Sequence, residues 1–254
     1  MAKTQEKTGK KQGSSFVIEQ PTLVTICVEI TGTAPLIQNN FSQKAIEEML
    51  RKHMGLSVQR EKKIPSEVIE RAIIRNAEGA VCIPPTAIKK AMLTASTQVK
   101  GLKKTTLRSQ LFIEGGSIPI TFSRMVPRMD MVRTSGIGRT PDVRFRPAFE
   151  DWSARLIFVF SDMIPAQTII DLCNRAGHVG VGEWRPEKDG NFGTFSISRN
   201  ITDPEEIKEV RKACRPSLMQ LQIPDWAMNA EISDDILRKI AGGETEGDGA
   251  GEEE

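Results

Sequence analysis

Two strand–helix–strand units follow one another in this sequence, and their order constrains the fold more than any other feature. In the first unit, apolar and polar residues alternate from Thr22 to Thr33, and this period of two predicts a half-buried strand. A helix beginning at Pro85 is indicated by an apolar stripe with helical spacing, formed by Ile88, Ala91, Met92 and Ala95. The short apolar runs 111–113 and 118–120, separated by Gly115-Gly116, predict a β-hairpin.

The second unit repeats this order. Ala154–Ser161 predicts a strongly apolar strand, and Pro165 opens a helix for which Gly177 is the expected C-cap. Phe192–Ser198 predicts the last core strand. Two such units favour an α+β fold of the ferredoxin-like type, a split βαβ arrangement in which two helices back a four-stranded sheet. RRM-type modules use a sheet of this kind to bind RNA.

Further segments surround these units within one domain, expected to span residues 16–242. Residues 38–79 predict a helical insertion, with one helix over Gln43–Lys52 capped by Ser42 and a second from Ser66 to about Arg75. Residues 123–148 are rich in arginine and interrupted by glycine and proline, which predicts a long loop or an extended hairpin. Residues 201–242 predict C-terminal helices. The first of these begins with a capping box at Thr202–Glu205, and the last is capped by Ser233. Residues 1–15 and 243–254 read as a disordered basic arm and a disordered acidic tail.

Charge is strongly segregated although the net charge is only +2. From Lys100 to Arg146 there are ten basic residues and three acids, and seven of the ten are arginines. Such a basic stretch favours a polyanionic partner, because guanidinium groups match phosphate and each neutralised phosphate releases counterions. The alternative is an ordinary solvated loop.

The stretch 176–195 is dense in glycine and also carries His178, Trp184, Arg185 and Lys188. Glycine-rich loops often cradle phosphate through backbone N–H groups, and we expect this loop to approach a nucleic-acid backbone. It follows a helix, whereas a dinucleotide-binding loop follows a strand, and no GxxxxGK[ST] motif occurs. The alternative is a helix C-cap joined to a β-hairpin.

Composition excludes several classes of protein. No apolar run is long enough to span a membrane, and the polar N-terminus does not resemble a secretory signal. The four cysteines are scattered without a CxxC pair, which argues against a zinc site or a disulfide framework. We therefore expect a reduced, cytoplasmic protein without metal or cofactor.

Three segments in this order resemble the RAMP superfamily, the RNA-binding proteins of CRISPR effector complexes, and most of all its backbone subunits. They are the strand followed by 34–42 (APLIQNNFS), the Ile-Pro entry into a helix at 81–91 (VCIPPTAIKKA), and the glycine-rich stretch. The sequences RFRP at 144–147 and GEWRP at 182–186 are also similar to uncharacterised phage and prophage proteins of that kind. The resemblance covers roughly residues 22–200. It implies a ferredoxin-like palm with a thumb-like hairpin and a helical insertion that hold a guide or target strand.

The expected nucleic-acid-binding residues come from these segments and from the basic stretch: Asn39, Asn40, Phe41, Lys89, Lys90, Lys103, Lys104, Arg124, Arg128, Arg133, Arg139, Arg144, Arg146, His178, Gly180, Gly182, Trp184, Arg185 and Lys188. Trp184 is a candidate for stacking on an unpaired base, and Trp152 is either a second such candidate or a core residue.

Superfamily members that cut target RNA use an aspartate in the loop after the first strand, and Thr33–Gln43 contains no acid. The leading interpretation is therefore a non-catalytic protein that binds single-stranded RNA, or DNA, and that assembles along its ligand as a homo-oligomer or within a larger nucleoprotein complex. One alternative is a metal-independent endoribonuclease with His178 as its general base. Another is a structural or protein-interaction component with the same fold.

Overall fold

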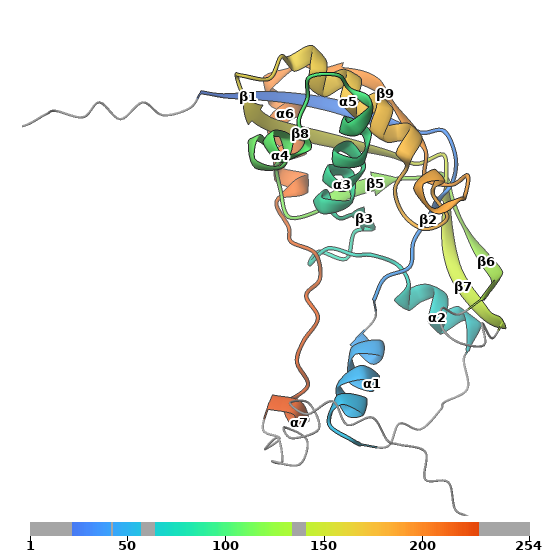
Figure 1. Cartoon of the computed structure of the whole chain (residues 1–254). Coiled ribbons are helices and arrows are strands. Elements are labelled where there is room, and N and C mark those ends of the chain that lie inside the picture. The colour runs from blue at the N-terminus through green and yellow to red at the C-terminus, as the bar shows by residue number, and fades with distance from the viewer. Residues whose placement is uncertain (1–21, 42, 57–63, 134–140, 229–254) are drawn as a thin grey trace, which may run out of the picture.

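The computed structural model describes residues 22–41, 43–56, 64–133 and 141–228. Helices pack against two antiparallel sheets (Figure 1), so the prediction of an α+β fold is confirmed. The predicted N-terminal arm, acidic tail, Ser42 cap and Ser233-capped helix lie outside the described residues. None of the described helices is both long and apolar enough to cross a membrane.

The larger sheet is organised around β1 (Leu23–Gly32), which pairs with antiparallel neighbours on both sides. Its register with β8 runs from Leu23 opposite Ser161 to Thr31 opposite Ser153. The strand order is β3-β5-β8-β1-β9, and β4 also pairs with β8. The strands that surround β1 are β3 (Cys82–Ile83), β4 (Leu111–Ile113), β5 (Ile118–Thr121), β8 (Ser153–Ser161) and β9 (Phe195–Ile201).

One face of this sheet carries the main core beneath α3 (Pro85–Ala95) and α5 (Ala166–Val179). The predicted stripe of α3 is buried throughout. In α5 the buried stripe is Ile169, Leu172, Cys173 and Ala176. This helix ends at Gly180, with φ +78°, three residues later than predicted, while Gly177 lies within the helix against the Phe195 carbonyl group.

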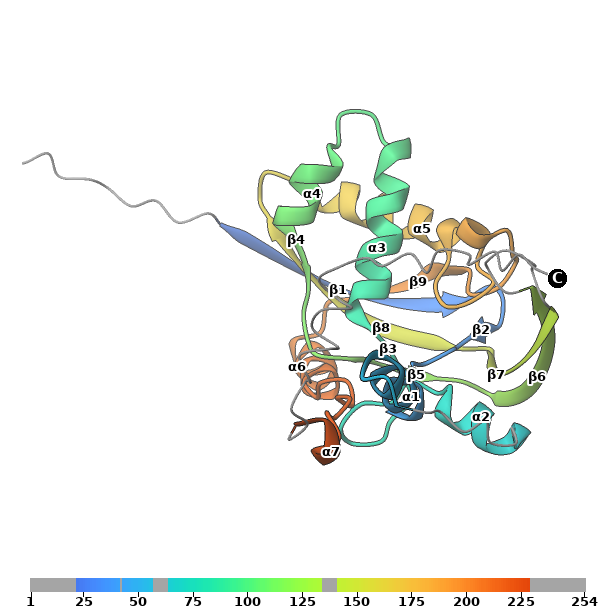
Figure 2. The same cartoon turned by 60° about the horizontal axis from the view of Figure 1, so that its bottom comes forward.

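The opposite face is covered by α6 (Pro204–Cys214), and Figure 2 shows α6 on the other side of the sheet from α3 and α5. Val210 and Cys214 pack there against Cys27, Ile157 and Ile201. Ion pairs join Arg155 and Arg199 to Glu29 and Glu206 on the same face. RRM-type modules bind RNA on an open sheet face, and α6 covers part of that face here. The N-cap of α6 is Asp203, whose carboxylate accepts from the Glu205 N–H, rather than the predicted Thr202.

The predicted hairpin of residues 111–120 is wrong. β4 and β5 do not pair with each other; both lie along β8, which makes them two pieces of one interrupted strand. Gly115 and Gly116 lie against the chain that follows α6, where the Gly116 N–H donates to the Cys214 carbonyl oxygen. A side chain at Gly115 would overlap that backbone, so the glycines serve close approach rather than a two-residue turn.

The smaller sheet has the order β2-β7-β6 and contains an extended hairpin, β6 (Arg124–Arg133) and β7 (Pro141–Glu150), with β2 (Leu36–Ile37) at its base. Its two faces differ in chemistry. Met129 and Met131 are exposed on one face, opposite Phe145 and Val143. The other face carries Arg128, Asp130, Arg144 and Arg146. The arginine-rich stretch therefore forms a hairpin with one apolar face and one charged face.

Residues 38–79 contain α1 (Gln43–His53) and α2 (Pro65–Arg71). α1 buries none of its residues and stands apart from both sheets (Figure 1). Two reciprocal hydrogen bonds between Gln43 and Gln222 connect it to the segment before α7 (Asp225–Met228). α2 ends earlier than predicted, because Ala72 and Ile73 turn into the core and the Ile74 N–H donates to Gln38. The remaining helix, α4 (Lys104–Gln110), leads into β4.

All four cysteines are buried and free among apolar neighbours, as expected of small hydrophobic residues. Burial raises the pKa of Cys27, Cys82 and Cys214 to about 11 and that of Cys173 to about 12.

Above about pH 9 the unfolded chain releases thiol protons that the folded chain keeps, so folding stability falls as pH rises from about 9 towards 11. We expect the midpoint of urea unfolding to fall between pH 8 and pH 10, and to fall less in Cys173→Ala; an equal fall would contradict this origin.

Candidate nucleic-acid interface

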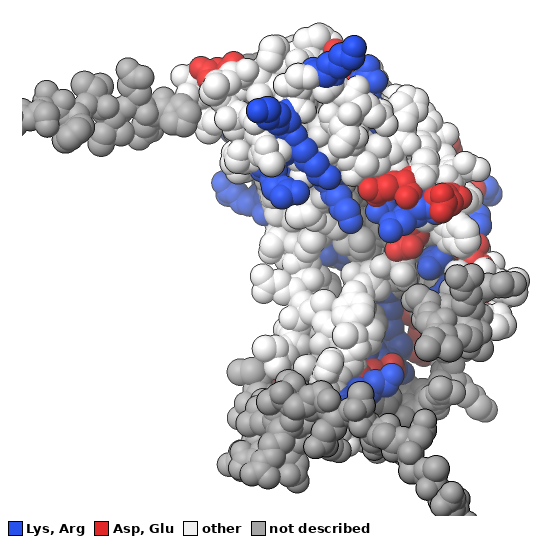
Figure 3. All heavy atoms as spheres, viewed as in Figure 1, with Lys and Arg blue, Asp and Glu red and all other residues white. Residues whose placement is uncertain are grey.

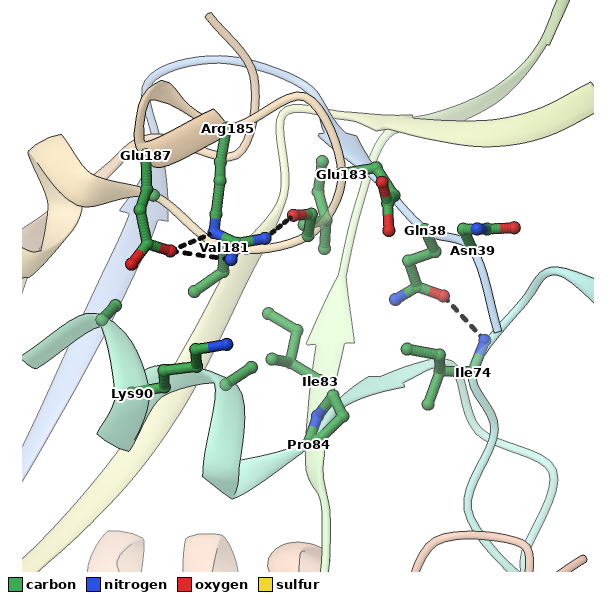
Figure 4. A pocket seen from close by; sticks show the side chains of 15 residues that line it. Gln38, Asn39, Ile74, Ile83, Pro84, Lys90, Val181, Glu183, Arg185 and Glu187 are labelled. Atoms are coloured by element: carbon green, nitrogen blue, oxygen red, sulfur yellow. Dashed lines mark hydrogen bonds and ion pairs between the residues drawn. The ribbon is translucent and has the colours of Figure 1, made fainter. Parts of the chain in front are cut away.

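Three segments far apart in the sequence meet around one hollow, which we call the central hollow. They are the residues after β1, the start of α3 and the glycine-rich loop, and Figure 4 shows their side chains converging. The hollow has a volume of about 230 Å³. Its apolar lining includes Leu36, Ile74, Ile83, Pro84 and Val181, and its polar lining includes Gln38, Asn39, Lys90, Glu183, Arg185 and Glu187. The structure thus brings together Asn39, Lys90, Gly180, Gly182 and Arg185 from the predicted set.

The glycine-rich loop is bonded tightly to the segment after β1. The Glu183 N–H donates to the Ile37 carbonyl oxygen at 2.9 Å, and the Gly193 N–H donates to that of Pro35 at 2.8 Å. The Gly180 N–H donates to Ala176 within the helix end. These three N–H groups are bonded within the chain and are not available to a phosphate. The glycines instead let the loop lie against its neighbours.

Gly182 offers a test of that role. It has φ +79°, and a Cβ there would overlap the Ile37 carbonyl oxygen, whereas Gly79 has φ +84° with no atom within 4 Å of a Cβ. Alanine at either position incurs backbone strain of about 1–2 kcal/mol, and only Gly182→Ala adds a collision. We expect Gly182→Ala to reduce the free energy of unfolding by at least about 1 kcal/mol more than Gly79→Ala in urea melts. Equal losses would show that the close approach is unimportant.

Arg185 holds the loop in shape. It donates to the Gly182 carbonyl oxygen at 2.8 Å and to the Glu187 carboxylate at 2.9 and 2.7 Å. Glu187 also accepts from the Thr94 hydroxyl at 3.0 Å, which connects the loop to α3. These hydrogen bonds, that from Arg185 first, lower the pKa of Glu187. The charge of Arg185 is therefore matched inside the protein. Trp184, half-buried with φ +53°, accepts a hydrogen bond on its carbonyl oxygen from the Phe192 N–H.

Four lysines of the predicted set form no ion pair within the part of the chain that the structure describes. Lys90 lines the central hollow, Lys103 and Lys104 lie at the start of α4, and Lys188 lies in the glycine-rich loop; all four are exposed. None of the four forms an ion pair with another residue that the structure describes. Figure 3 shows basic side chains over α3 and α4 with few acids between them. Lys89 is placed differently, because its ammonium group lies 5.0 Å from the centre of the exposed Phe112 ring.

Most arginines of the hairpin, in contrast, are neutralised by acids nearby. Arg124 binds Glu150 at 2.7 Å, Arg128 binds Asp130 at 2.9 Å and Arg144 binds Asp142 at 2.9 Å. Arg146 is 6% exposed and Arg133 is the last residue of β6. Arg139 lies outside the described residues. The excess of arginine in the sequence therefore overstates the charge that the hairpin presents to a ligand.

The remaining predicted residues lie at the edges of this region. Asn40 is bonded to the end of α2 through Ala72 and Ile73, while Phe41 beside it is 50% exposed. His178 is exposed on the last turn of α5 and does not line the central hollow. Trp152 is completely buried, and its indole N–H donates to the Ala34 carbonyl oxygen, so it is a core residue.

Sequence reasoning missed Gln38. It is 2% exposed, and its side-chain amide donates to the Cys82 carbonyl oxygen at 3.0 Å and accepts from the Ile74 N–H at 2.8 Å. These bonds fix the floor of the central hollow and the position of Asn39. The one signal in the sequence for Gln38 was its place inside the segment 34–42.

Comparison with known proteins adds little. No protein-family model matches the sequence, and no curated protein matches it. Among solved structures, the chain is similar to a chain of the type III-B Cmr-beta complex bound to its cognate target RNA, determined by cryo-electron microscopy. The two share 13% identity over 70% of this chain, with a TM-score of 0.44. This chain spans 60% of the length of the one that it matches.

Proposed function

We propose that this chain is a non-catalytic protein that binds single-stranded RNA and works as a subunit of a larger nucleoprotein assembly. The observation that carries the proposal is the central hollow, where three distant segments meet beside exposed lysines that form no ion pair with another described residue. The antiparallel order β9-β1-β8-β4 with α3 and α5 on one face supports a ferredoxin-like palm of the RAMP type. In this proposal the hairpin of β6 and β7 is the thumb.

The chemistry of the surface suits an unpaired strand. A base offers a flat apolar face with polar edges, which fits a hollow lined by Leu36, Ile83 and Pro84 together with the Asn39 amide. The backbone phosphates would follow the exposed lysines from Lys90 towards Lys103 and Lys104 on α4. Lysine acts on phosphate as a point charge, so this contact carries no sequence preference.

The test is binding of fluorescein-labelled U20 RNA and dT20 DNA, measured by anisotropy, together with digestion of any nucleic acid that co-purifies with the protein. We expect binding to both single strands, weaker binding to duplex, and a steep loss of affinity with salt. Light scattering with a long RNA should show complexes that grow with RNA length if copies assemble along it. A protein that binds none of these strands contradicts the proposal and favours the protein-interaction alternative.

The same RNA tests the claim that the chain is not a nuclease. Its only two histidines are His53 and His178, and His178 does not line the central hollow. We expect the RNA to remain intact without metal. Cleavage that disappears in His178→Ala would establish the ribonuclease alternative instead.

A further inference from the structure

Arg146 is a buried arginine whose hydrogen-bonding capacity is largely unused. Its side chain is 7% exposed, and neither its Nε nor its Nη1 has a hydrogen-bond partner among the described residues. Two carboxylates lie at ion-pair distance, with Asp130 Oδ2 at 3.9 Å from Nη1 and Glu183 Oε2 at 4.0 Å from Nη2. A buried charge without hydrogen bonds is costly, so this guanidinium group is poised for a better acceptor.

The charged groups beside Arg146 also have hydrogen-bonding atoms that are unused among the described residues. Arg128 lies opposite Arg146 in the hairpin and stacks on Phe192, with 4.6 Å between the guanidinium carbon and the ring centre. It donates to Asp130 Oδ1 at 2.9 Å, yet its own Nε and Asp130 Oδ2 have no hydrogen-bond partner in the described part of the chain. We call Arg128, Asp130, Arg146 and Glu183 the arginine junction, because they join the polar face of the hairpin to the glycine-rich loop.

Glu183 is the member of the arginine junction that can leave. Its side chain is 43% exposed, against 12% for that of Asp130, and it also lines the central hollow. Its contact with Arg146, at 4.0 Å, is an ion pair without a hydrogen bond. Rotation of this carboxylate into solvent would leave two arginines facing a single acid, next to the place at the rim of the central hollow that Glu183 occupies.

We propose that the arginine junction is a phosphate-binding site, which the Glu183 carboxylate closes in the free protein. A phosphate group brings several acceptor oxygens and binds guanidinium groups in a bidentate manner, so it supplies hydrogen-bond acceptors for the unbonded nitrogens of Arg146 and Arg128. The phosphate comes either from a nucleic-acid strand that passes the central hollow, which rests on the proposed function, or from a free phosphate compound.

The first experiment uses inorganic phosphate and thermal unfolding of the full chain. We expect saturating phosphate to raise the Tm of the wild type by about 3 °C or more. Glu183→Gln, which keeps the shape but removes the competing charge, should reach half of that rise at a phosphate concentration about three- to tenfold lower. Arg146→Met should show no rise. The matched control is Arg211→Met on α6, which removes an arginine bound to Glu114 on the other face of the larger sheet and should show the same phosphate-induced rise in Tm as the wild type. No rise in the wild type, or an equal rise in Arg146→Met, overturns the proposal.

The second experiment repeats these variants with labelled U20 RNA. If the phosphate belongs to the strand, Glu183→Gln should bind about three- to tenfold more tightly, and the gain should vanish in Glu183→Gln combined with Arg146→Met. If Glu183→Gln binds RNA as wild type yet responds more strongly to inorganic phosphate, the site takes a free phosphate compound. Phosphate response without any RNA binding leaves the site in place and removes the proposed function. RNA binding with no phosphate response in any variant, and no gain in Glu183→Gln, removes the site alone.

Discussion

Replacing Lys90, Lys103 and Lys104 together with alanine is expected to weaken binding to single-stranded RNA by about a hundredfold at 0.1 M salt. Each phosphate contact on a single strand contributes about −0.7 to the slope of log K against log salt, so three lost contacts make the slope less negative by about 2. The three side chains are exposed and form no ion pair with described residues, so their loss should leave the Tm almost unchanged. Anisotropy titrations between 0.05 and 0.3 M salt would measure both effects.

A control with the same change in net charge decides whether the effect is local. Lys208, Lys212 and Arg215 are exposed on or just after α6, which covers the other face of the sheet. Their triple replacement with alanine should weaken binding only a few-fold, through the general field of the protein. Equal losses in the two triple variants would show that RNA is attracted by net charge and does not follow α3 and α4.

The regular elements could be predicted because periodicity is a local property. The alternation in β1 and the apolar stripe in α3 are set by the face that each element buries, and the structure buries those faces. The pairing of short strands is not local. β4 and β5 looked like the arms of a hairpin, but their partner is β8, about 40 residues further along the chain. Only the close contact of Gly115 and Gly116 with the end of α6 explains those glycines, and no local pattern reveals it.

The segments that form the candidate site could be predicted from the sequence, but the charge that its surface presents could not. The segments around the central hollow were identified in the sequence, but their meeting depends on hydrogen bonds such as that from Gly193 to Pro35. A count of charges along the sequence did not show which arginines lie beside an acid. A signal was present, because Arg128 and Asp130, like Asp142 and Arg144, are two residues apart and so share one face of a strand. Reading residues 123–148 as strands would have predicted those pairs.

The second large effect concerns the central hollow itself. Ala87 lines it from the first turns of α3 and is partly buried against the main core. Ala87→Trp places an indole ring beside Lys90, in a space of about 230 Å³. If a base enters this space, its loss costs about 1–3 kcal/mol of binding free energy, which corresponds to roughly five- to 150-fold in affinity. The loss should be equal at low and high salt, because no phosphate contact is removed, and this separates it from the effect of the lysine variant.

Two further measurements make the result specific. Ala213→Trp puts the same ring on the exposed surface of α6 and should bind U20 RNA as wild type. An oligonucleotide that carries the fluorescent base 2-aminopurine should change its emission when it binds the wild type, because the base moves from stacked neighbours into the hollow, and should change much less with Ala87→Trp. Both variants need a Tm close to that of the wild type for the comparison to count. Undiminished affinity in a folded Ala87→Trp would place the strand elsewhere, since a filled hollow cannot accept a base, and would leave the lysines of α3 and α4 as a separate surface.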